Sequence, residues 1–151
     1  MSITNEQVQM LRQKCAGMDL TEGERLSNHT SFKIGGPARL MAFPKDASQA
    51  SAILSAARSC RIPVVILGAG TNVLMPDAGM DVLVISSRQM QANITLLADH
   101  RIYADAGCSL SRVAVFARDH GLSGMECLHG IPGSVGGAVR MNSGAYGGGQ
   151  A

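Results

Sequence analysis

The chain has 151 residues and a net charge of +2, with 46% hydrophobic, 16% charged and 3% aromatic residues. Its hydrophobic fraction is sufficient for the core of one domain or of two small ones. The weak charge, the lack of a basic run and the lack of tryptophan argue against a nucleic-acid surface built on phosphate contacts or base stacking.

The same sequence argues against a membrane protein and against a metal or redox motif. No apolar run approaches the roughly 18 residues of a membrane span, and no signal peptide is recognisable at the N-terminus. We therefore expect a cytoplasmic protein with no membrane association, no nucleic acid and no obligatory protein partner. None of the cysteines belongs to a C-x-x-C pair, so we expect four buried, reduced thiols and no metal site: Cys15, Cys60, Cys108 and Cys127.

A helix is predicted over residues 4–17 at the beginning of the chain. Thr4 and Gln7 fit the capping box, and Gly17 is a suitable end. Residues 18–31 show no clear periodicity and are expected to be irregular.

The next segment predicts a turn, a strand and a helix. The sequence Gly-Gly-Pro at 35–37 forces a turn before a short strand at 40–43. A helix is predicted over 47–60, capped by Asp46. Its apolar stripe consists of Ala50, Ile53, Leu54 and Ala57.

Two apolar strands follow this helix, at 63–67 and 82–85. The first is a continuous apolar run, which is typical of a strand buried on both faces. The order strand, helix, strand indicates a right-handed crossover and parallel pairing.

The second half of the chain predicts a hairpin and another helix. Strands at 94–97 and 101–104 flank a turn at Asp99-His100. A helix over 109–120 carries an apolar stripe of Leu110, Val113, Ala114 and Ala117 and ends at Gly121. A change of composition near 86–92 suggests the boundary between two subdomains, 1–88 and 89–151.

Residues Gly68 to Leu74 form a glycine loop directly after a strand. The loop fails the dinucleotide-binding fingerprint because Val73 occupies the third glycine position and because Pro76 and Gly79 prevent a following helix. No Gly-Lys-Ser/Thr of a P-loop occurs. Main-chain N–H groups of this loop could bind an anion by another backbone path, and an ordinary tight turn remains the alternative.

A second glycine-rich segment covers residues 129–147, and ten of the 18 glycines lie from Gly121 onward. Its glycines alternate with apolar and small polar residues, which argues against a flexible linker. Within Gly130 to Gly137, Ser134 could cap or donate, and the following residues, Val135 to Val139, could pack very close to a flat ring. Close packing of a glycine-rich helix or loop is the alternative.

Together these segments resemble a known family, UDP-N-acetylenolpyruvoylglucosamine reductase (the MurB family). The resemblance spans about residues 28–147 and depends on motifs in the family's order. They are Asn-His-Thr-Ser-Phe-Lys-Ile-Gly-Gly-Pro-Ala at 28–38, Gly-x-Gly-Thr-Asn-Val-Leu at 68–74, Gly-Leu-Ser-Gly-Met-Glu at 121–126, Gly-Ile-Pro-Gly-Ser-Val-Gly-Gly-Ala at 130–138 and Met-Asn-Ser-Gly-Ala-Tyr-Gly at 141–147.

The resemblance implies an α+β fold, the FAD-binding fold of the vanillyl-alcohol oxidase type, with two subdomains of which the second is truncated. It also implies non-covalent FAD, NADPH as reductant, and hydride transfer to a UDP-sugar enolpyruvate to give UDP-N-acetylmuramate for peptidoglycan. Three stretches then correspond to the cofactor site. They are the pyrophosphate loop, Gly68, Ala69, Gly70, Thr71, Asn72, Val73 and Leu74; the stretch on pyrophosphate and flavin, Gly130, Ile131, Pro132, Gly133, Ser134, Val135, Gly136 and Gly137; and the continuation along the cofactor, Asn142, Gly144, Ala145 and Tyr146.

The chain departs from the family in length, because members are about twice as long. The family's arginine, glutamate and serine of catalysis, and the domain for the UDP-sugar, match no part of this sequence, so we expect no catalytic residue in this chain. Glu126 is expected to support its loop, and Arg140 to face solvent. Two other hypotheses stay open: a stand-alone, non-catalytic FAD- or nucleotide-binding module, and an oxidase of the wider flavoprotein superfamily.

Overall fold

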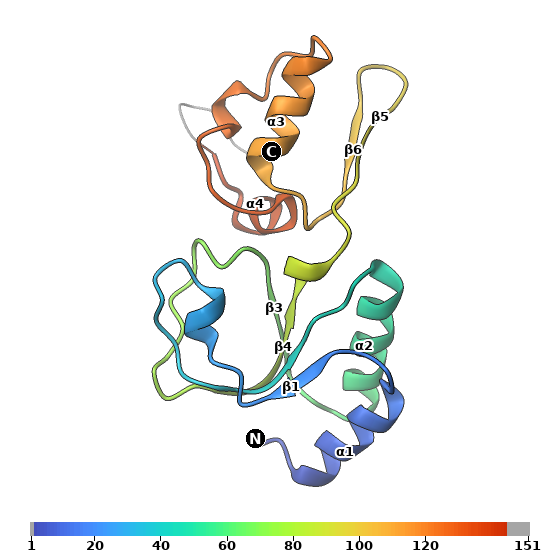
Figure 1. Ribbon diagram of the computed structural model, residues 1–151, viewed down its shortest axis with the longest axis vertical. Helices are drawn as coiled ribbons and strands as arrows, with labels where there is room; N and C mark the ends of the chain where they lie inside the picture. Colours follow the sequence, from blue (N-terminus) through green and yellow to red (C-terminus); the bar gives the residue numbers. More distant parts are fainter. Residues whose placement is uncertain (1, 145–151) are drawn as a thin grey trace. The chain divides into compact units, whose positions relative to one another are not determined.

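The computed structural model describes residues 2–144, and the chain divides into two compact units, residues 1–90 and 91–151. The first unit is built on a four-stranded sheet of order β1-β2-β4-β3, with β1 Leu20–Glu22, β2 Ala38–Ala42, β3 Val64–Leu67 and β4 Met80–Ser86. Strands β2, β4 and β3 are parallel, whereas β1 is antiparallel to β2. The strands that flank the predicted helix, β2 and β3, are parallel as expected, but they do not pair directly, because β4 lies between them and pairs with both (Figure 1).

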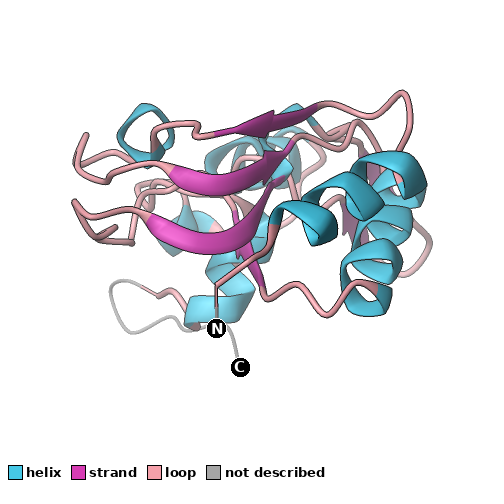
Figure 2. Cartoon of the chain, turned by 90° about the horizontal axis from the view of Figure 1, so that it is seen from below, coloured by secondary structure: helices cyan, strands magenta, loops and turns pink. Residues whose placement is uncertain are grey.

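Two helices cover one face of this sheet, α1 Asn5–Lys14 and α2 Ala47–Ser59. Thr4 and Gln7 make the predicted capping box, and the Asp46 carboxylate accepts a hydrogen bond from the N–H of Gln49 (2.8 Å). The shared core contains Val8, Leu11, Ile53 and Ala57 from the helices and Leu40, Ala42, Leu83 and Ile85 from the sheet (Figure 2). Leu54, which the stripe predicted to be buried, is 39% exposed, and Ala56 is buried instead.

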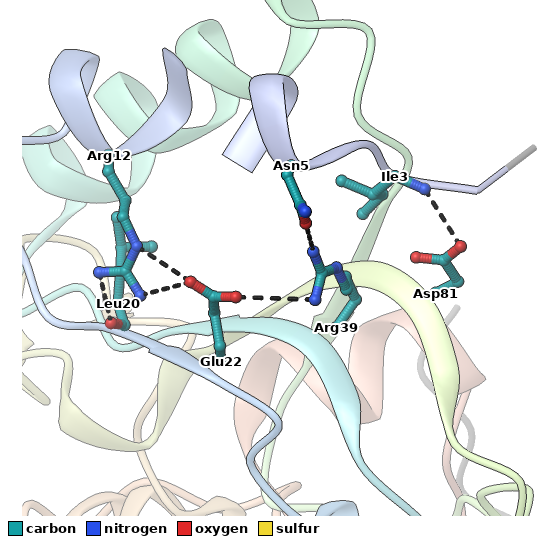
Figure 3. Close-up of polar contacts among 7 residues, drawn as sticks. All are labelled: Ile3, Asn5, Arg12, Leu20, Glu22, Arg39 and Asp81. Atoms are coloured by element: carbon teal, nitrogen blue, oxygen red, sulfur yellow. Dashed lines mark hydrogen bonds and ion pairs between the residues drawn. The ribbon is translucent and has the colours of Figure 1, made fainter. Parts of the chain in front are cut away.

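Polar contacts attach α1 to the edge of the sheet (Figure 3). The Glu22 carboxylate accepts hydrogen bonds from the Arg12 guanidinium (3.0 Å) and forms an ion pair with Arg39 (3.6 Å). The N–H of Ile3 donates to the Asp81 carboxylate (3.1 Å). Because these side chains are partly exposed, each ion pair contributes only about 0–1 kcal/mol.

Loops, and no helices longer than one turn, cover the opposite face of the sheet. This second core contains Leu26, Met41, Phe43, Leu67, Met75 and Val84. Leu26 belongs to a 3-10 helix, η1 Leu26–His29, that lies in the stretch expected to be irregular, and so does β1. That prediction is wrong because elements of three or four residues are too short to show a period.

The strand β3 was expected to be buried on both faces, and this is also wrong. Ile66 is 67% exposed, and Val64 and Val65 are only half-buried. The reason is the strand order, since β3 lies at the edge of the sheet and buries only Leu67 fully, whereas β2 and β4 lie between other strands. A short η2 helix, Ser87–Gln89, follows β4.

The second unit contains the predicted hairpin and helix. Strands β5 Ile94–Leu96 and β6 Ile102–Ala104 are antiparallel, and Asp99 and His100 have φ of 59° and 58°. Two such residues in sequence are typical of a type I′ turn. The helix α3 Leu110–Asp119 ends at Gly121 (φ 69°), and its stripe of Leu110, Val113, Ala114 and Ala117 is buried as predicted.

The structure adds two elements that the sequence did not predict, η3 Glu126–Leu128 and α4 Val135–Met141. Both lie in the glycine-rich half of this unit. Leu128 and Ala138 from these elements pack with Leu110 to form the core of the unit. Within residues 2–144 no helix is long and apolar enough to cross a membrane.

Candidate functional site: two glycine-rich segments

The first segment, Gly68 to Leu74, leaves the end of β3 without entering a helix, and no helix occurs before β4. This confirms that the loop is not a dinucleotide-binding fingerprint, because that motif places a helix N-terminus at the pyrophosphate. Gly70 is buried, Gly68 and Ala69 are half-buried, and Asn72 is exposed. The loop therefore presents its backbone, and not a helix dipole, to solvent.

Gly70 fixes the loop against residues 29–31. Its φ is +71°, and a Cβ added there would lie 2.0 Å from the carbonyl oxygen of His29. The N–H of Ser31 donates to the carbonyl of Gly70 (2.9 Å). No residue with a side chain fits this position without moving the backbone, since glycine alone combines the left-handed conformation with such close contact.

The same pair of loops is locked at its other end by Gly36 and Gly79. A Cβ on Gly36 would lie 2.1 Å from the carbonyl oxygen of Asp77, and one on Gly79 would lie 2.2 Å from that of Pro37. The N–H of Gly36 donates to the carbonyl of Pro76 (2.9 Å). The Gly-Gly-Pro sequence therefore does more than turn the chain, because it lets residues 28–38 pack backbone to backbone against residues 68–79.

This packing leaves a run of main-chain donors without partners. Among residues 2–144, no hydrogen bond is made by the N–H groups of four loop residues, Gly70, Asn72, Val73 and Leu74. Successive N–H groups on a loop of fixed shape form an anion-binding concavity. The geometry thus favours the anion-binding interpretation over an ordinary tight turn.

His29 holds the chain segment that packs against this loop, and its side chain is not arranged for proton transfer. Its Nε2 lies 2.8 Å from the Glu24 carboxylate, and its ring contacts the ring of Phe43 in a tilted arrangement, with 5.5 Å between the ring centroids and 45° between the planes. The hydrogen bonds from His29 and Asn28 lower the pKa of Glu24. The side chain thus fixes the residue whose carbonyl group packs against Gly70.

The second segment, Gly130 to Gly137, is joined to residues 106–110 by backbone hydrogen bonds. Leu110 N–H donates to the carbonyl of Gly133 (3.0 Å), and Gly136 N–H donates to that of Ala106 (2.9 Å). A Cβ on Gly136 would lie 2.9 Å from the Cβ of Ala106. The glycine is required because α4 begins directly against residues 106–108.

Ser134 caps α4, one of the two roles that the sequence suggested. It is only 5% exposed, and its hydroxyl accepts a hydrogen bond from the N–H of Gly137 (3.3 Å). The helix ends at Asn142 in the left-handed conformation (φ 48°). Gly136 and Gly137 therefore lie in the first turn of a short helix.

This helix changes which N–H groups the segment can offer. The N–H groups of Val135, Gly136 and Gly137 already donate within the unit. In the described part of the chain, those of Gly133 and Ser134 donate to no acceptor. They lie directly before the amino end of α4, and free main-chain N–H groups can contact a negatively charged group.

The remaining polar candidates have structural roles. Glu126 accepts a hydrogen bond from the N–H of Gly124 (2.8 Å), as expected for a residue that supports its loop. His120 contacts the carbonyl of Phe116 (2.8 Å) at the end of α3. Arg140 is exposed, also as expected.

The thiols and the last predicted residues complete the comparison with the sequence. Cys15, Cys60 and Cys108 are buried and Cys127 is half-buried, and burial raises the pKa of Cys15 and Cys108. Such thiols are poor nucleophiles.

Of the residues predicted to continue along the cofactor, Asn142 and Gly144 are exposed. Two predicted cofactor residues lie outside the described residues, Ala145 and Tyr146.

Comparison with known proteins agrees with this geometry. Residues 38–151 match the family described as FAD binding domain. The chain belongs to this family. Both glycine-rich segments, residues 68–74 and 129–147, lie within the match.

Curated relatives share a single name, UDP-N-acetylenolpyruvoylglucosamine reductase. The protein of Lactobacillus delbrueckii subsp. bulgaricus is 42% identical over 89% of this chain and 45% of its own length. That of Pseudothermotoga lettingae is 46% identical over 83% of this chain and 42% of its own length. The chain thus spans less than half the length of these relatives.

Solved structures agree on the fold. The crystal structure of UDP-N-acetylenolpyruvylglucosamine reductase (MurB) from Thermus caldophilus has a TM-score of 0.67 at 30% identity, covering 87% of this chain and 44% of that one. A cholesterol oxidase from Brevibacterium sterolicum has a TM-score of 0.66 at 16% identity over 85% of this chain and 25% of its own. The fold is therefore the α+β FAD-binding fold of the vanillyl-alcohol oxidase type, as predicted, and the likeness supports the FAD-binding part of a MurB-type reductase.

Proposed function

We propose that the chain is the FAD-binding part of a UDP-N-acetylenolpyruvoylglucosamine reductase, with residues 1–88 and 89–151 as its two cofactor-binding subdomains. The parent enzyme would use NADPH to reduce a UDP-sugar enolpyruvate to UDP-N-acetylmuramate for peptidoglycan, in the cytoplasm. The observation that carries this proposal is the set of unpartnered N–H groups of Gly70, Asn72, Val73 and Leu74 among residues 2–144, within a chain of the FAD binding domain family.

The donor set fits the pyrophosphate of FAD. A pyrophosphate needs several donors within a short range, and the loop holds these N–H groups close together on a backbone that Gly36, Gly70 and Gly79 fix. In the second unit, we assign the N–H groups of Gly133 and Ser134 as the donors of the Gly130–Gly137 stretch. We assign Asn142, Gly144, Ala145 and Tyr146 as the continuation along the cofactor.

The bound flavin would supply hydride transfer, while the described residues would bind and orient it. Among residues 2–144, His29, His120 and Glu126 are used in loop and helix contacts, and they form no set of acid and oxyanion donors. We therefore expect the 151-residue chain to bind FAD but not to oxidise NADPH with the enolpyruvyl substrate. Steady turnover by the purified chain would contradict this assignment.

The first experiment is to mix the purified chain with FAD, separate free cofactor by gel filtration and record the visible spectrum of the protein peak. A flavin band in a compact peak is the expected result. FMN, which has the flavin but no pyrophosphate, is the control ligand and should be retained far less. A colourless peak with FAD would overturn the proposal.

A further inference from the structure

Phe32 lies beside the Gly68–Leu74 loop and is 60% exposed. The chain has three phenylalanines and no tryptophan, and the other two, Phe43 and Phe116, are buried or half-buried. Single exposed apolar side chains are common on proteins and carry no meaning alone. The surroundings of Phe32 are more informative than its exposure.

The turn that contains Phe32 has a fixed conformation. Thr30 is 3% exposed, and its hydroxyl donates to the carbonyl of Ile34 (3.1 Å). The N–H of Lys33 donates to the carbonyl of Thr30 (3.3 Å), and Lys33 has a φ of +57°. Because the turn is closed from within, little backbone entropy remains to be lost if Phe32 contacts a ligand.

This turn is attached to the loop with the unpartnered N–H groups. Ser31, the neighbour of Phe32, donates its N–H to Gly70 (2.9 Å), and consecutive Cα atoms are only about 3.8 Å apart. Figure 1 shows the two segments running together on one side of the first unit. Two further apolar side chains of the same segments are exposed, Ile34 (42%) and Leu74 (72%).

Donors for an anion and exposed apolar side chains thus occur next to each other on one rigid surface. A flavin adenine dinucleotide has the matching chemistry, because its pyrophosphate links two flat heteroaromatic ring systems. An aromatic side chain stabilises such a ring by stacking on its face. A simple anion such as free phosphate would make no use of Phe32.

We propose that Phe32 contacts the face of one ring system of FAD and increases the affinity of this site for the whole cofactor. The proposal rests on the proposed function, since it names a further residue of the same site. Stacking of a base on an aromatic side chain corresponds to about a 5- to 100-fold change in affinity when the side chain is removed.

The test is the dissociation constant of FAD for the full 151-residue chain, measured by calorimetry. Phe32→Ala should weaken FAD binding by about tenfold or more, whereas Phe32→Tyr should bind within about threefold of the wild type because it keeps the ring. Met10→Ala is the matched control, because Met10 is also exposed (44%) but lies on α1. Its affinity for FAD should not change.

Titrations with ADP and FMN identify which ring system of FAD, adenine or flavin, Phe32 contacts. Weaker ADP binding by Phe32→Ala, with FMN binding unchanged, would support contact with adenine, and the reverse pattern would support contact with the flavin. Phe32→Leu keeps the apolar bulk without a flat ring, so it decides the question if Phe32→Ala does not fold: it should bind FAD more weakly than Phe32→Tyr.

Two negative outcomes are distinguishable. Equal FAD affinities for the wild type, Phe32→Ala and Phe32→Leu would overturn the assignment of Phe32 alone. Failure of the wild type to bind FAD would overturn the proposed function and this assignment together.

Discussion

Substitution of Gly70 by alanine tests whether the packing of the two loops holds the candidate site in place. The added Cβ would lie 2.0 Å from the carbonyl oxygen of His29, and Cβ atoms in proteins essentially never approach a neighbour below 3.0 Å. The two groups must therefore separate by about 1 Å or more, which would also break the hydrogen bond from Ser31 to Gly70. The matched control is Gly23→Ala, because Gly23 has nearly the same φ (+68°) but no atom within 4 Å of its added Cβ.

The magnitudes follow from these two environments. A left-handed alanine costs about 1–2 kcal/mol at either position. At Gly70, the lost hydrogen bond adds about 1 kcal/mol, and the backbone displacement adds to that. We expect a loss of about 2–4 kcal/mol in the free energy of unfolding for Gly70→Ala, against about 1–2 kcal/mol for Gly23→Ala.

Urea unfolding of both variants, followed by circular dichroism, measures this difference, and FAD retention on gel filtration is the second readout. Gly70→Ala should lose FAD, and Gly23→Ala should keep it. If the two variants were equally stable and equally able to retain FAD, the close approach at Gly70 would not control the loop, and the reasoning would be refuted.

Three further outcomes are expected. Ser134→Ala removes the cap of α4 and should lower the free energy of unfolding of the second unit by about 1 kcal/mol in urea titrations; an unchanged midpoint would show that the bond to Gly137 contributes nothing. Glu24→Gln tests the lowered pKa of Glu24. The ionised carboxylate stabilises the fold above the ordinary carboxyl pKa of about 4.3, and this stabilisation is lost as the pH falls through the pKa in the folded protein. The variant should therefore have a lower free energy of unfolding than the wild type at pH 7 and an equal one below pH 4; a difference independent of pH would exclude a role for the charge paired with His29. Ile66→Thr replaces an exposed edge-strand side chain and should change stability by less than about 0.5 kcal/mol while reducing turbidity on heating; a loss above about 1 kcal/mol would mean that Ile66 is buried in solution.

The longer elements could be predicted because their local signals and their packing agree. Thr4 with Gln7 and Asp46 cap α1 and α2 as their sequence spacing indicates, and Gly121 ends α3. Asp99 and His100 form the predicted hairpin turn although neither is glycine, because short polar side chains tolerate the left-handed conformation. In these places the residues that fix the element are within four positions of each other.

The wrong predictions concern elements whose burial or conformation is determined by residues distant in the sequence. The burial of β3 depends on its place at the sheet edge, which no run of apolar residues in the sequence records. The helix α4 contains Gly136 and Gly137, both poor helix formers, and it forms because the Ser134 cap and the hydrogen bonds to Ala106 and Cys108 stabilise its first turn. Two features of the sequence could have revealed α4. Ser134 is a suitable N-cap, and Ala138 and Met141 after it are three residues apart, as on one face of a helix.

For the candidate site, the sequence identified the loop but not the reason for its shape. Asn72 and Gly70 were recognised as part of a glycine loop after a strand, while the requirement for glycine at 36 and 70 comes from carbonyl groups 41 residues away from each. Availability of individual N–H groups, such as those of Gly133 and Ser134, also depends on which neighbours are already bonded. The requirement for glycine and the availability of N–H groups both depend on tertiary contacts, which the local composition does not record.

The backbone lock between residues 28–38 and 68–79 has a consequence for the order of events during synthesis on the ribosome. The Gly70 loop can take its shape only when Gly70 packs on His29 and Gly79 packs on Pro37, so the first 80 or so residues, roughly half of this chain, must have emerged before the loop is stable. Until then the N–H groups of the loop are free to move and hydrated. Cofactor capture by a nascent chain would therefore follow completion of the first sheet and could not nucleate it.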